Sequence, residues 1–253
     1  MTLLERCRER GWIKERGKQR TDSTHVEAAI RVMNRLECAG ETLRAALEHL
    51  AVVVPDWLRT HVAQDWYDRY GKRMEEYRFP KEATKRQALA EQIGQDGWNL
   101  LNWVREADAP VWLREIPAVE ILRSVWVQQF WVDEGQIRWR SDDMIPPASR
   151  LITSPYDSDA RRSVKRDTVW TGYKVHLTET CDENAPHMIL HVETTPATTH
   201  DMKMTDVIHE ELEHKQLLPS EHLMDAGYVD GEHIVNRGHF ITQNPPKDEL
   251  RRV

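Results

Sequence analysis

The stretch Trp170-Thr-Gly-Tyr-Lys-Val-His-Leu-Thr-Glu-Thr180 alternates between apolar and polar side chains. Tyr173, Val175 and Leu177 fall on one side, and this period of two predicts a half-buried β-strand. A second apolar run, 188–194, follows a turn-forming segment at 181–186. The two runs predict a β-hairpin, from which a larger sheet can be built.

Downstream of this hairpin, helical and strand patterns alternate. The pattern predicts a helix over 201–215, a strand over 222–226, a second helix over 230–237 and a second strand over 239–243. We interpret Asp201 as the N-terminal cap of the first of these helices, because aspartate is a favoured capping residue. A hairpin followed by alternating strands and helices predicts an α/β fold, in which helices cover a mixed sheet.

Upstream of the hairpin, the hydrophobic period changes. Between residues 25 and 134 apolar side chains recur at helical spacing, as at Leu43 and Leu47, which predicts a set of helices. The longest of these patterns after residue 80 lie over 81–106 and 119–133. Nine of the ten tryptophans fall within 57–170, which predicts aromatic cores among the helices. The segment 142–158 is rich in proline and serine and predicts a boundary.

The composition is that of a soluble globular protein, since 40% of the 253 residues are hydrophobic and 30% are charged. No run approaches the roughly 18 to 20 apolar residues that cross a membrane. The first ten residues lack the apolar core of a signal peptide, so we expect a cytoplasmic protein. Three scattered cysteines predict neither a disulfide framework nor a cysteine-based metal site.

The charge is unevenly distributed along the chain. A net charge of −7 by itself disfavours a nucleic-acid partner, because phosphates attract basic surfaces. Basic residues are nevertheless concentrated in 1–20 and in 161–174, and the second group consists of Arg161, Arg162, Lys165, Arg166 and Lys174. These five side chains either neutralise DNA phosphates or solvate an edge strand.

Two short motifs place an aspartate in a strand or at its edge: Thr21-Asp22-Ser23-Thr24 and Met224-Asp225-Ala226-Gly227-Tyr228. Aspartate is disfavoured in strands, so each carboxylate needs a partner. Asp22 either caps a helix that starts near His25 or binds a cation, and Asp225 either begins a turn with Gly227 or binds a cation. If the two strands are neighbours in one sheet, the carboxylates converge and a divalent-metal site becomes possible.

Three longer stretches carry a resemblance to a known family: QRTDSTH at 19–25, SPYDSDARRSVKRDTVWTGYKVHL at 154–177 and VETTPATTHD at 192–201. With the DAGY sequence at 225–228, they resemble DDE-type transposases of bacterial insertion sequences, over about residues 3–243. The resemblance implies an RNase H-like mixed sheet with flanking helices, plus an all-helical insertion between the first and second strands. The resemblance implies three parts: a basic N-terminal segment with the first strand (1–24), the helical insertion (25–141) and the remainder of the catalytic domain (142–253).

The resemblance also implies a chemistry and a set of catalytic residues. Asp22 corresponds to the family's first catalytic acid and Asp225 to the second. With a glutamate they would hold two Mg²⁺ or Mn²⁺ ions for DNA cleavage and strand transfer. The family's glutamate lies on a helix after the last strand, and Glu249, the only glutamate near that place, lacks the family's surrounding pattern. We therefore expect a truncated transposase that is inactive in this form.

DNA is the partner that the resemblance implies, both as the terminal inverted repeats of the element and as the target, together with self-association of the transposase. Two other functions remain open. One is a non-catalytic DNA-binding or inhibitory remnant of a transposase, which the missing glutamate favours. The other is an unrelated metal-dependent nuclease of the same fold.

Overall fold

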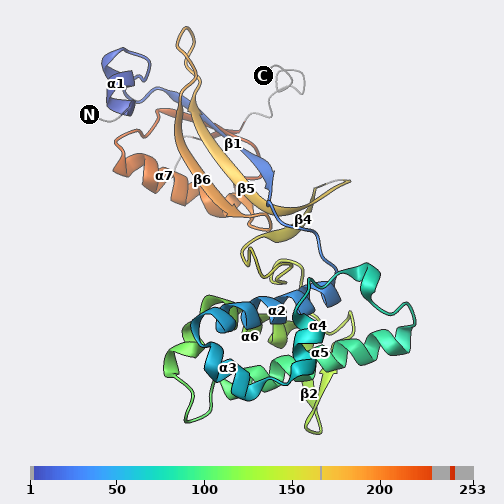
Figure 1. The fold of residues 1–253 in the computed structure, drawn as a ribbon. Helices are drawn as coiled ribbons and strands as arrows, with labels where there is room; N and C mark the ends of the chain where they lie inside the picture. Colours follow the sequence, from blue (N-terminus) through green and yellow to red (C-terminus); the bar gives the residue numbers. More distant parts are fainter. Residues whose placement is uncertain (1–2, 166, 230–239, 243–253) are drawn as a thin grey trace. The chain divides into compact units, whose positions relative to one another are not determined.

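The chain is described from a computed structural model, which places residues 3–165, 167–229 and 240–242. It forms two compact units, coloured along the chain in Figure 1. The sheet unit consists of Met1–Glu27 and Gly172–Val253, and the helical unit consists of Ala28–Thr171. Each unit is built around a hydrophobic cluster of its own.

Among the described residues, the strands of the sheet unit are β1 (Lys18–Glu27), β5 (Thr168–Thr180), β6 (Ile189–Pro196), β7 (Glu221–Met224) and β8 (Phe240–Thr242). Their spatial order is β6-β5-β1-β7-β8. β5 is antiparallel to both β1 and β6, whereas β7 is parallel to both β1 and β8. A further strand, β4 (Arg161–Lys165), precedes β5 and pairs with it. The sheet is mixed, as the sequence predicts.

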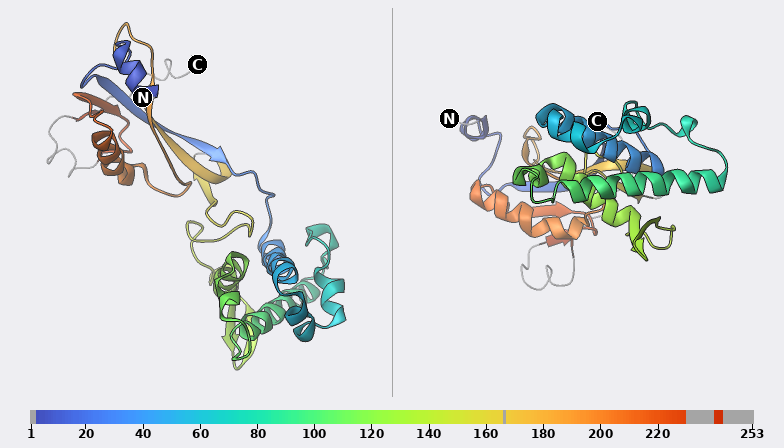
Figure 2. Two further views of the ribbon diagram at one scale, coloured as in Figure 1. Left: turned by 60° about the vertical axis from the view of Figure 1, so that its left-hand side comes forward. Right: turned by 60° about the horizontal axis from the view of Figure 1, so that its bottom comes forward.

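Helix α7 (Met204–His214) lies along one face of the sheet, as both views in Figure 2 show. The first residues of β1 alternate in burial, with Gln19 and Thr21 buried. A short helix, α1 (Leu3–Glu9), completes this side of the unit. The buried cluster consists of Cys7, Ile13, Leu190, Met204, Ile208, Leu212, Leu217, Met224 and Tyr228. This one-sided packing leaves the alternate residues of β1, among them Asp22, exposed within the described part of the chain.

The helical unit contains α2 (Arg35–Val53), α3 (Pro55–His61), α4 (Gln64–Tyr70), α5 (Ala83–Trp103) and α6 (Pro117–Gln129), with the short 3-10 helices η1 (Glu76–Arg78) and η2 (Val111–Glu115) between them. A hairpin of β2 (Phe130–Asp133) and β3 (Gln136–Trp139) follows α6. Helices α2, α5 and α6 pack on one another. Leu43 and Leu50 of α2 are fully buried, and Trp66 and Trp126 are buried in the same cluster. The predicted aromatic core is therefore present.

The proline- and serine-rich segment after β3 packs on the helical unit. The Gln128 side chain accepts from the amide of Ile152 at 2.9 Å and donates to the carbonyl of Arg150 at 2.9 Å. The hydroxyl of Tyr156 donates to Glu41 of α2 at 2.6 Å. Because of these contacts the division between the units falls between Thr171 and Gly172, later in the chain than the boundary that composition suggests.

Most of the predicted elements are confirmed. The strands at 170–180, 188–194, 222–226 and 239–243 and the helices at 81–106 and 201–215 correspond to β5, β6, β7, β8, α5 and α7. The helix predicted over 230–237 lies outside the described residues. None of the described helices is long and apolar enough to span a membrane.

Two predictions about local structure are wrong, and one strand is missing from the predictions. No helix starts near His25, because β1 continues to Glu27 through its pairing with β5. The helix predicted over 119–133 ends at Gln129, and its last residues form β2 of a hairpin. Strand β4 was not predicted, because Arg-Arg-Ser-Val-Lys does not alternate in polarity; its pairing with β5 holds it extended.

Candidate functional site at the sheet edge

The structure brings Asp22 and Asp225 to the same edge of the sheet. Thr21 of β1 pairs with Met224 of β7, and the two strands are parallel. Asp22 follows Thr21 within β1, and Asp225 is the first residue after β7, so the two aspartates come directly after the last residue pair of this register. Asp22 is exposed and Asp225 is half-buried. The sequence-based expectation that these strands are neighbours is confirmed.

A tight turn after β7 fixes the carboxylate of Asp225. The Oδ1 atom of Asp225 accepts from the amide of Gly227 at 2.8 Å, and the carbonyl of Asp225 accepts from the amide of Tyr228 at 3.1 Å. A Cβ atom on Gly227 would lie 2.9 Å from Asp225 Oδ1, which is closer than real Cβ atoms approach. A side chain at position 227 would therefore displace the carboxylate of Asp225. On β1, Asp22 Oδ1 accepts from the amide of Ser23 at 2.7 Å.

A third carboxylate, that of Asp201, lies beside the same turn. Asp201 Oδ2 is 3.6 Å from the position that a Cβ on Gly227 would occupy. Its Oδ1 accepts from Lys174 Nζ at 2.6 Å, and its Oδ2 accepts from Ser23 Oγ at 3.3 Å. Asp201 is the first residue of the short helix η3 (Asp201–Lys203), whose N-cap position is occupied by His200. The interpretation of Asp201 as a helix cap is wrong, because the carboxylate is turned toward β1 and β5.

Tyr228 is the buried centre of this edge. Its side chain is fully buried, and its hydroxyl lies 2.6 Å from His176 Nδ1. Burial raises the pKa of Tyr228, and the negative charges of Asp201, Asp22 and Asp225 raise it further. The phenol of Tyr228 therefore stays protonated at neutral pH.

Buried polar groups form the floor of the site between the sheet and α7. Thr21 Oγ1 lies 2.7 Å from Thr178 Oγ1 and 2.8 Å from His222 Nε2. His222 Nδ1 in turn lies 2.9 Å from Nε2 of His209 on α7. Buried polar networks whose members are paired are rigid. This one fixes β1, β5 and β7 directly beneath the two aspartates.

The predicted basic residues are not all alike. Arg161 is half-buried, Arg162 and Lys165 are exposed on β4, and Arg166 lies outside the described residues. Lys174 is only 18% exposed, and its ammonium is engaged by Asp201 and by the carbonyl of Thr199 at 2.5 Å. The role predicted for these side chains toward DNA phosphates stays a prediction.

The edge fits a hard divalent cation by its donor chemistry. Mg²⁺ in phosphoryl-transfer sites is often held by one or two carboxylates, with waters and substrate phosphates supplying the other ligands. Asp22 and Asp225 provide two such carboxylates on neighbouring strands. Within the described residues no three acidic, histidine or cysteine side chains are arranged to hold a metal ion. Glu249, the glutamate weighed as a third acid, lies outside those residues.

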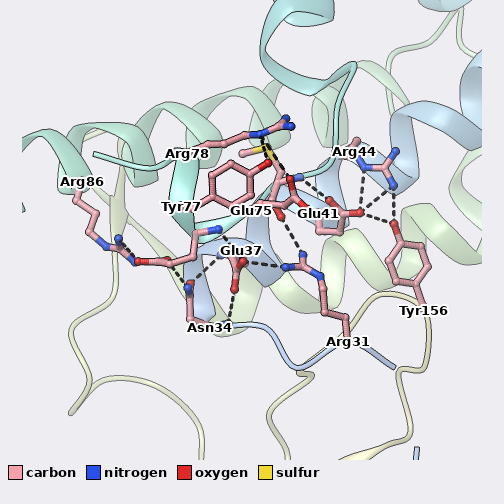
Figure 3. A network of polar contacts seen from close by, with 12 residues as sticks. Arg31, Asn34, Glu37, Glu41, Arg44, Glu75, Tyr77, Arg78, Arg86 and Tyr156 are labelled. Atoms are coloured by element: carbon pink, nitrogen blue, oxygen red, sulfur yellow. Dashed lines mark hydrogen bonds and ion pairs between the residues drawn. The ribbon is translucent and has the colours of Figure 1, made fainter. Parts of the chain in front are cut away.

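A second acidic cluster, on α2 of the helical unit, is drawn in Figure 3. Glu41 accepts from Arg44 at 2.8 Å, from Tyr156 at 2.6 Å and from the amide of Met74 at 2.9 Å. Burial acts to raise the pKa of Glu41, but Arg44 and the other donors outweigh it, so that the pKa is lowered.

Neighbouring Glu37 is held in the same way. It accepts from Arg31 at 2.8 Å and from the amide of Glu76 at 2.7 Å, and it forms a reciprocal capping box with Asn34. Burial is again outweighed by these donors, and the pKa of Glu37 is lowered. Fixed protein groups thus occupy both carboxylates, which connect the residues 74–76 and Tyr156 to α2. The cluster is structural, and the sheet edge is the better candidate for chemistry.

Comparisons of the chain with protein-family models, with curated proteins and with solved structures give no match.

Proposed function

We propose that the sheet unit is the catalytic part of a DDE-type transposase, which cleaves DNA and transfers strands with the help of Mg²⁺ or Mn²⁺. The observation that carries this proposal is the placement of Asp22 and Asp225 directly after Thr21 and Met224, the last residue pair in the register of two neighbouring parallel strands. The motifs around these residues are the ones through which the sequence resembles that family. Two carboxylates so placed suit a reaction that develops negative charge on phosphate oxygens.

The strand arrangement supports an RNase H-like interpretation of the sheet. In chain order, three antiparallel strands, β1, β5 and β6, are followed by α7 and then by two parallel strands, β7 and β8. This is the order that the resemblance implies. The helical unit enters between β1 and β5, where the resemblance places an all-helical insertion.

In this proposal each group at the edge has a role. Asp22 and Asp225 would hold the metal, which when bound would help to form the attacking oxygen nucleophile and would neutralise charge on the phosphate. The turn at Gly227 orients Asp225 through its amide, and Ser23 orients Asp22 in the same way. Exposed basic side chains, Arg162 and Lys165 on β4, would bind the phosphate backbone.

A second candidate is a transposase remnant that binds DNA without cutting it. It is favoured by the sequence, in which Glu249 lacks the pattern that surrounds the third acid in the family. In that case the carboxylates of Asp22 and Asp225 would remain without a catalytic role, and the basic side chains would carry the function.

The test is a cleavage assay with the full chain, Mg²⁺ or Mn²⁺ and duplex DNA that carries the inverted repeats flanking its gene. We expect at most weak cleavage at the repeat ends, in keeping with the missing third acid, and none with Asp22→Asn or Asp225→Asn, because each removes a metal-binding charge. The matched control is Glu210→Gln, an exposed acid on α7, which should cleave normally. Cleavage that survives Asp22→Asn contradicts the site, and cleavage without regard to the repeats identifies a nuclease.

DNA binding is measured alongside as a function of salt. Neutral substitutions at Arg161, Arg162 and Lys165 should flatten the dependence of log affinity on log salt by roughly 0.9 for each phosphate that the protein no longer neutralises. Repeat-specific binding without any metal-dependent cleavage establishes the remnant. An unchanged slope assigns these side chains to a solvated strand instead.

A further inference from the structure

Lys174 is a half-buried cation at an edge of the sheet where three carboxylates lie. Its side chain is 18% exposed, on β5. The ammonium donates to Asp201 Oδ1 at 2.6 Å and to the carbonyl of Thr199 at 2.5 Å. A lysine in a partly desolvated position is stable only with such partners. Its charge is therefore fixed in place rather than available on the surface.

Asp201 connects this cation to the turn that carries Asp225. Its Oδ2 atom lies 3.6 Å from the point at which a Gly227 Cβ would sit, and Asp225 Oδ1 lies 2.9 Å from that same point. Ser23, the residue after Asp22, donates to Asp201 from β1. One carboxylate thus links β5, β1 and the turn after β7.

The carboxylates of Asp22, Asp225 and Asp201 lie at one edge of the sheet, and like charges repel one another. A bound divalent cation would offset that repulsion, but the edge must also be stable without one. The ammonium of Lys174 has the charge and the position to offset part of it.

We infer that Lys174 is a positioning residue, the internal counter-ion of this edge: by neutralising Asp201 it offsets the repulsion between that carboxylate and the carboxylate of the nearby Asp225 turn without a divalent cation, and its charge limits how tightly a cation binds. The first half of the inference needs no metal and stands on the contacts alone. The second half rests on the proposed function, because it concerns the cation that Asp22 and Asp225 would hold.

The half of the inference that needs no metal is tested by thermal unfolding of the full chain in EDTA. Amide hydrogen exchange follows the sheet unit in this experiment. Lys174→Gln should lower the Tm of this unit by roughly 4–8 °C, the shift expected for about 1 kcal/mol in a unit of this size. In an Asp225→Asn background the shift should be less than half as large, because one of the repelling charges is gone. Lys174→Arg, which keeps the charge, should behave like the parent chain.

The matched control is Lys18→Gln. Lys18 also bridges strands of this sheet, through an ion pair with Glu221 at 2.7 Å, but it is 53% exposed. Lys18→Gln should lower the Tm of the sheet unit only slightly, and by the same amount with or without Asp225→Asn. If Lys174→Gln gives equal shifts in both backgrounds, Lys174 is an ordinary ion pair and the inference is overturned.

The metal-dependent half is tested by calorimetric titration of the full chain with Mn²⁺. Lys174→Gln should tighten binding by roughly fivefold, the equivalent of about 1 kcal/mol, because a nearby positive charge is removed. Asp201→Asn should weaken binding, because it leaves the ammonium unpaired, and the double variant should return toward the parent. A merely structural pair would weaken binding in both single variants, which would overturn the inference.

The proposed function has its own readout in this titration. Binding of Mn²⁺ by the parent chain should be abolished in Asp22→Asn. If the parent binds no Mn²⁺, or if binding survives Asp22→Asn, the proposed function fails, while the coupling between Lys174 and Asp225 in EDTA still decides the counter-ion role.

Discussion

His222 shows how one residue beneath the site makes the fold sensitive to pH. Both of its ring nitrogens are engaged, by Thr21 and by His209. Burial, and then the charge of His209, lowers the pKa of His222 from about 6.5 to about 3. Between those two pH values the unfolded chain binds a proton at His222 that the folded chain does not.

The sheet unit should therefore lose stability as the pH falls from about 6.5 toward 3, and its stability should be independent of this group above about 7. The loss should approach the order of 4 kcal/mol at the acid end. Hydrogen exchange at the amides of β1 and β7, measured across that pH range, checks this. His222→Gln should flatten the dependence, and a curve of unchanged steepness in that variant would assign the acid sensitivity to other groups.

At the scale of single residues, Asp22 and Asp225 could be found from the sequence, but their neighbours could not. An aspartate in a strand pattern is conspicuous, because local propensity disfavours it. Asp201 follows a histidine at the start of a helical pattern and has the local signature of a cap. Asp201 has another role only because Lys174 and Ser23 contact it in the folded chain. These residues are distant in sequence, so no local sequence pattern predicts the contacts.

At the scale of secondary-structure elements, the packing of α5 on α6 depends on glycine. A Cβ atom on Gly97 would lie 2.0 Å from the ring of Trp126. The indole of Trp126 also donates to the carbonyl of Gly94 at 2.8 Å. The two glycines that weaken the helix pattern in the sequence are thus the places where a tryptophan lies against the helix backbone.

Gly97→Ala should therefore destabilise the helical unit, although alanine is the better helix former by about 1 kcal/mol. Overpacking of a core costs about 1–3 kcal/mol, and here the ring has to move, so we expect a net loss. Gln95→Ala, at an exposed position of the same helix, should change little. Differential scanning calorimetry compares the two, and a Gly97→Ala chain that is more stable than the parent would show that Trp126 moves aside without cost.

Elements whose apolar residues repeat regularly could be predicted from the sequence. Elements that form only through pairing with another strand could not. The long apolar stripe of α5 and the alternation of β5 are visible in the sequence because each buries one side along its length. By contrast, β2 continues the apolar pattern of α6, and it becomes a strand only through its pairing with β3. The extension of β1 to Glu27 similarly depends on β5.

At the scale of the whole molecule, the chain passes between the two units through paired strands. Glu27 pairs with Gly172, and the amide of Ala28 donates to the carbonyl of Thr171 at 2.9 Å. A two-residue turn can close a hairpin after such a pair. The helical unit is therefore inserted where a short turn could join β1 directly to β5.

Replacing residues 29–170 by Asn-Gly should give a sheet unit that folds by itself. Its strands should show the same hydrogen-exchange protection as in the full chain, and Mn²⁺ binding, if the full chain has it, should be retained. The matching fragment, 28–171, should also fold, because it has its own core. If neither fragment unfolds cooperatively in calorimetry, the two units depend on each other.

The position of the domain boundary shows what composition leaves out. Proline and serine mark the segment after residue 141 as a connection, and the structure leaves residues 142–160 without regular elements. Nevertheless Ile152 and Tyr156 are tied to the helical unit by hydrogen bonds. The segment 142–160 thus has the composition of a linker, but its contacts make it part of the helical unit.

The distribution of tryptophan between the units has a spectroscopic consequence. Nine of the ten tryptophans belong to the helical unit, and the tenth, Trp12, is 38% exposed in the sheet unit with Arg10 over its ring. Intrinsic fluorescence of the whole protein therefore reports almost entirely on the helices. In the sheet unit by itself, Trp12 becomes the sole indole emitter, a built-in probe that requires no label.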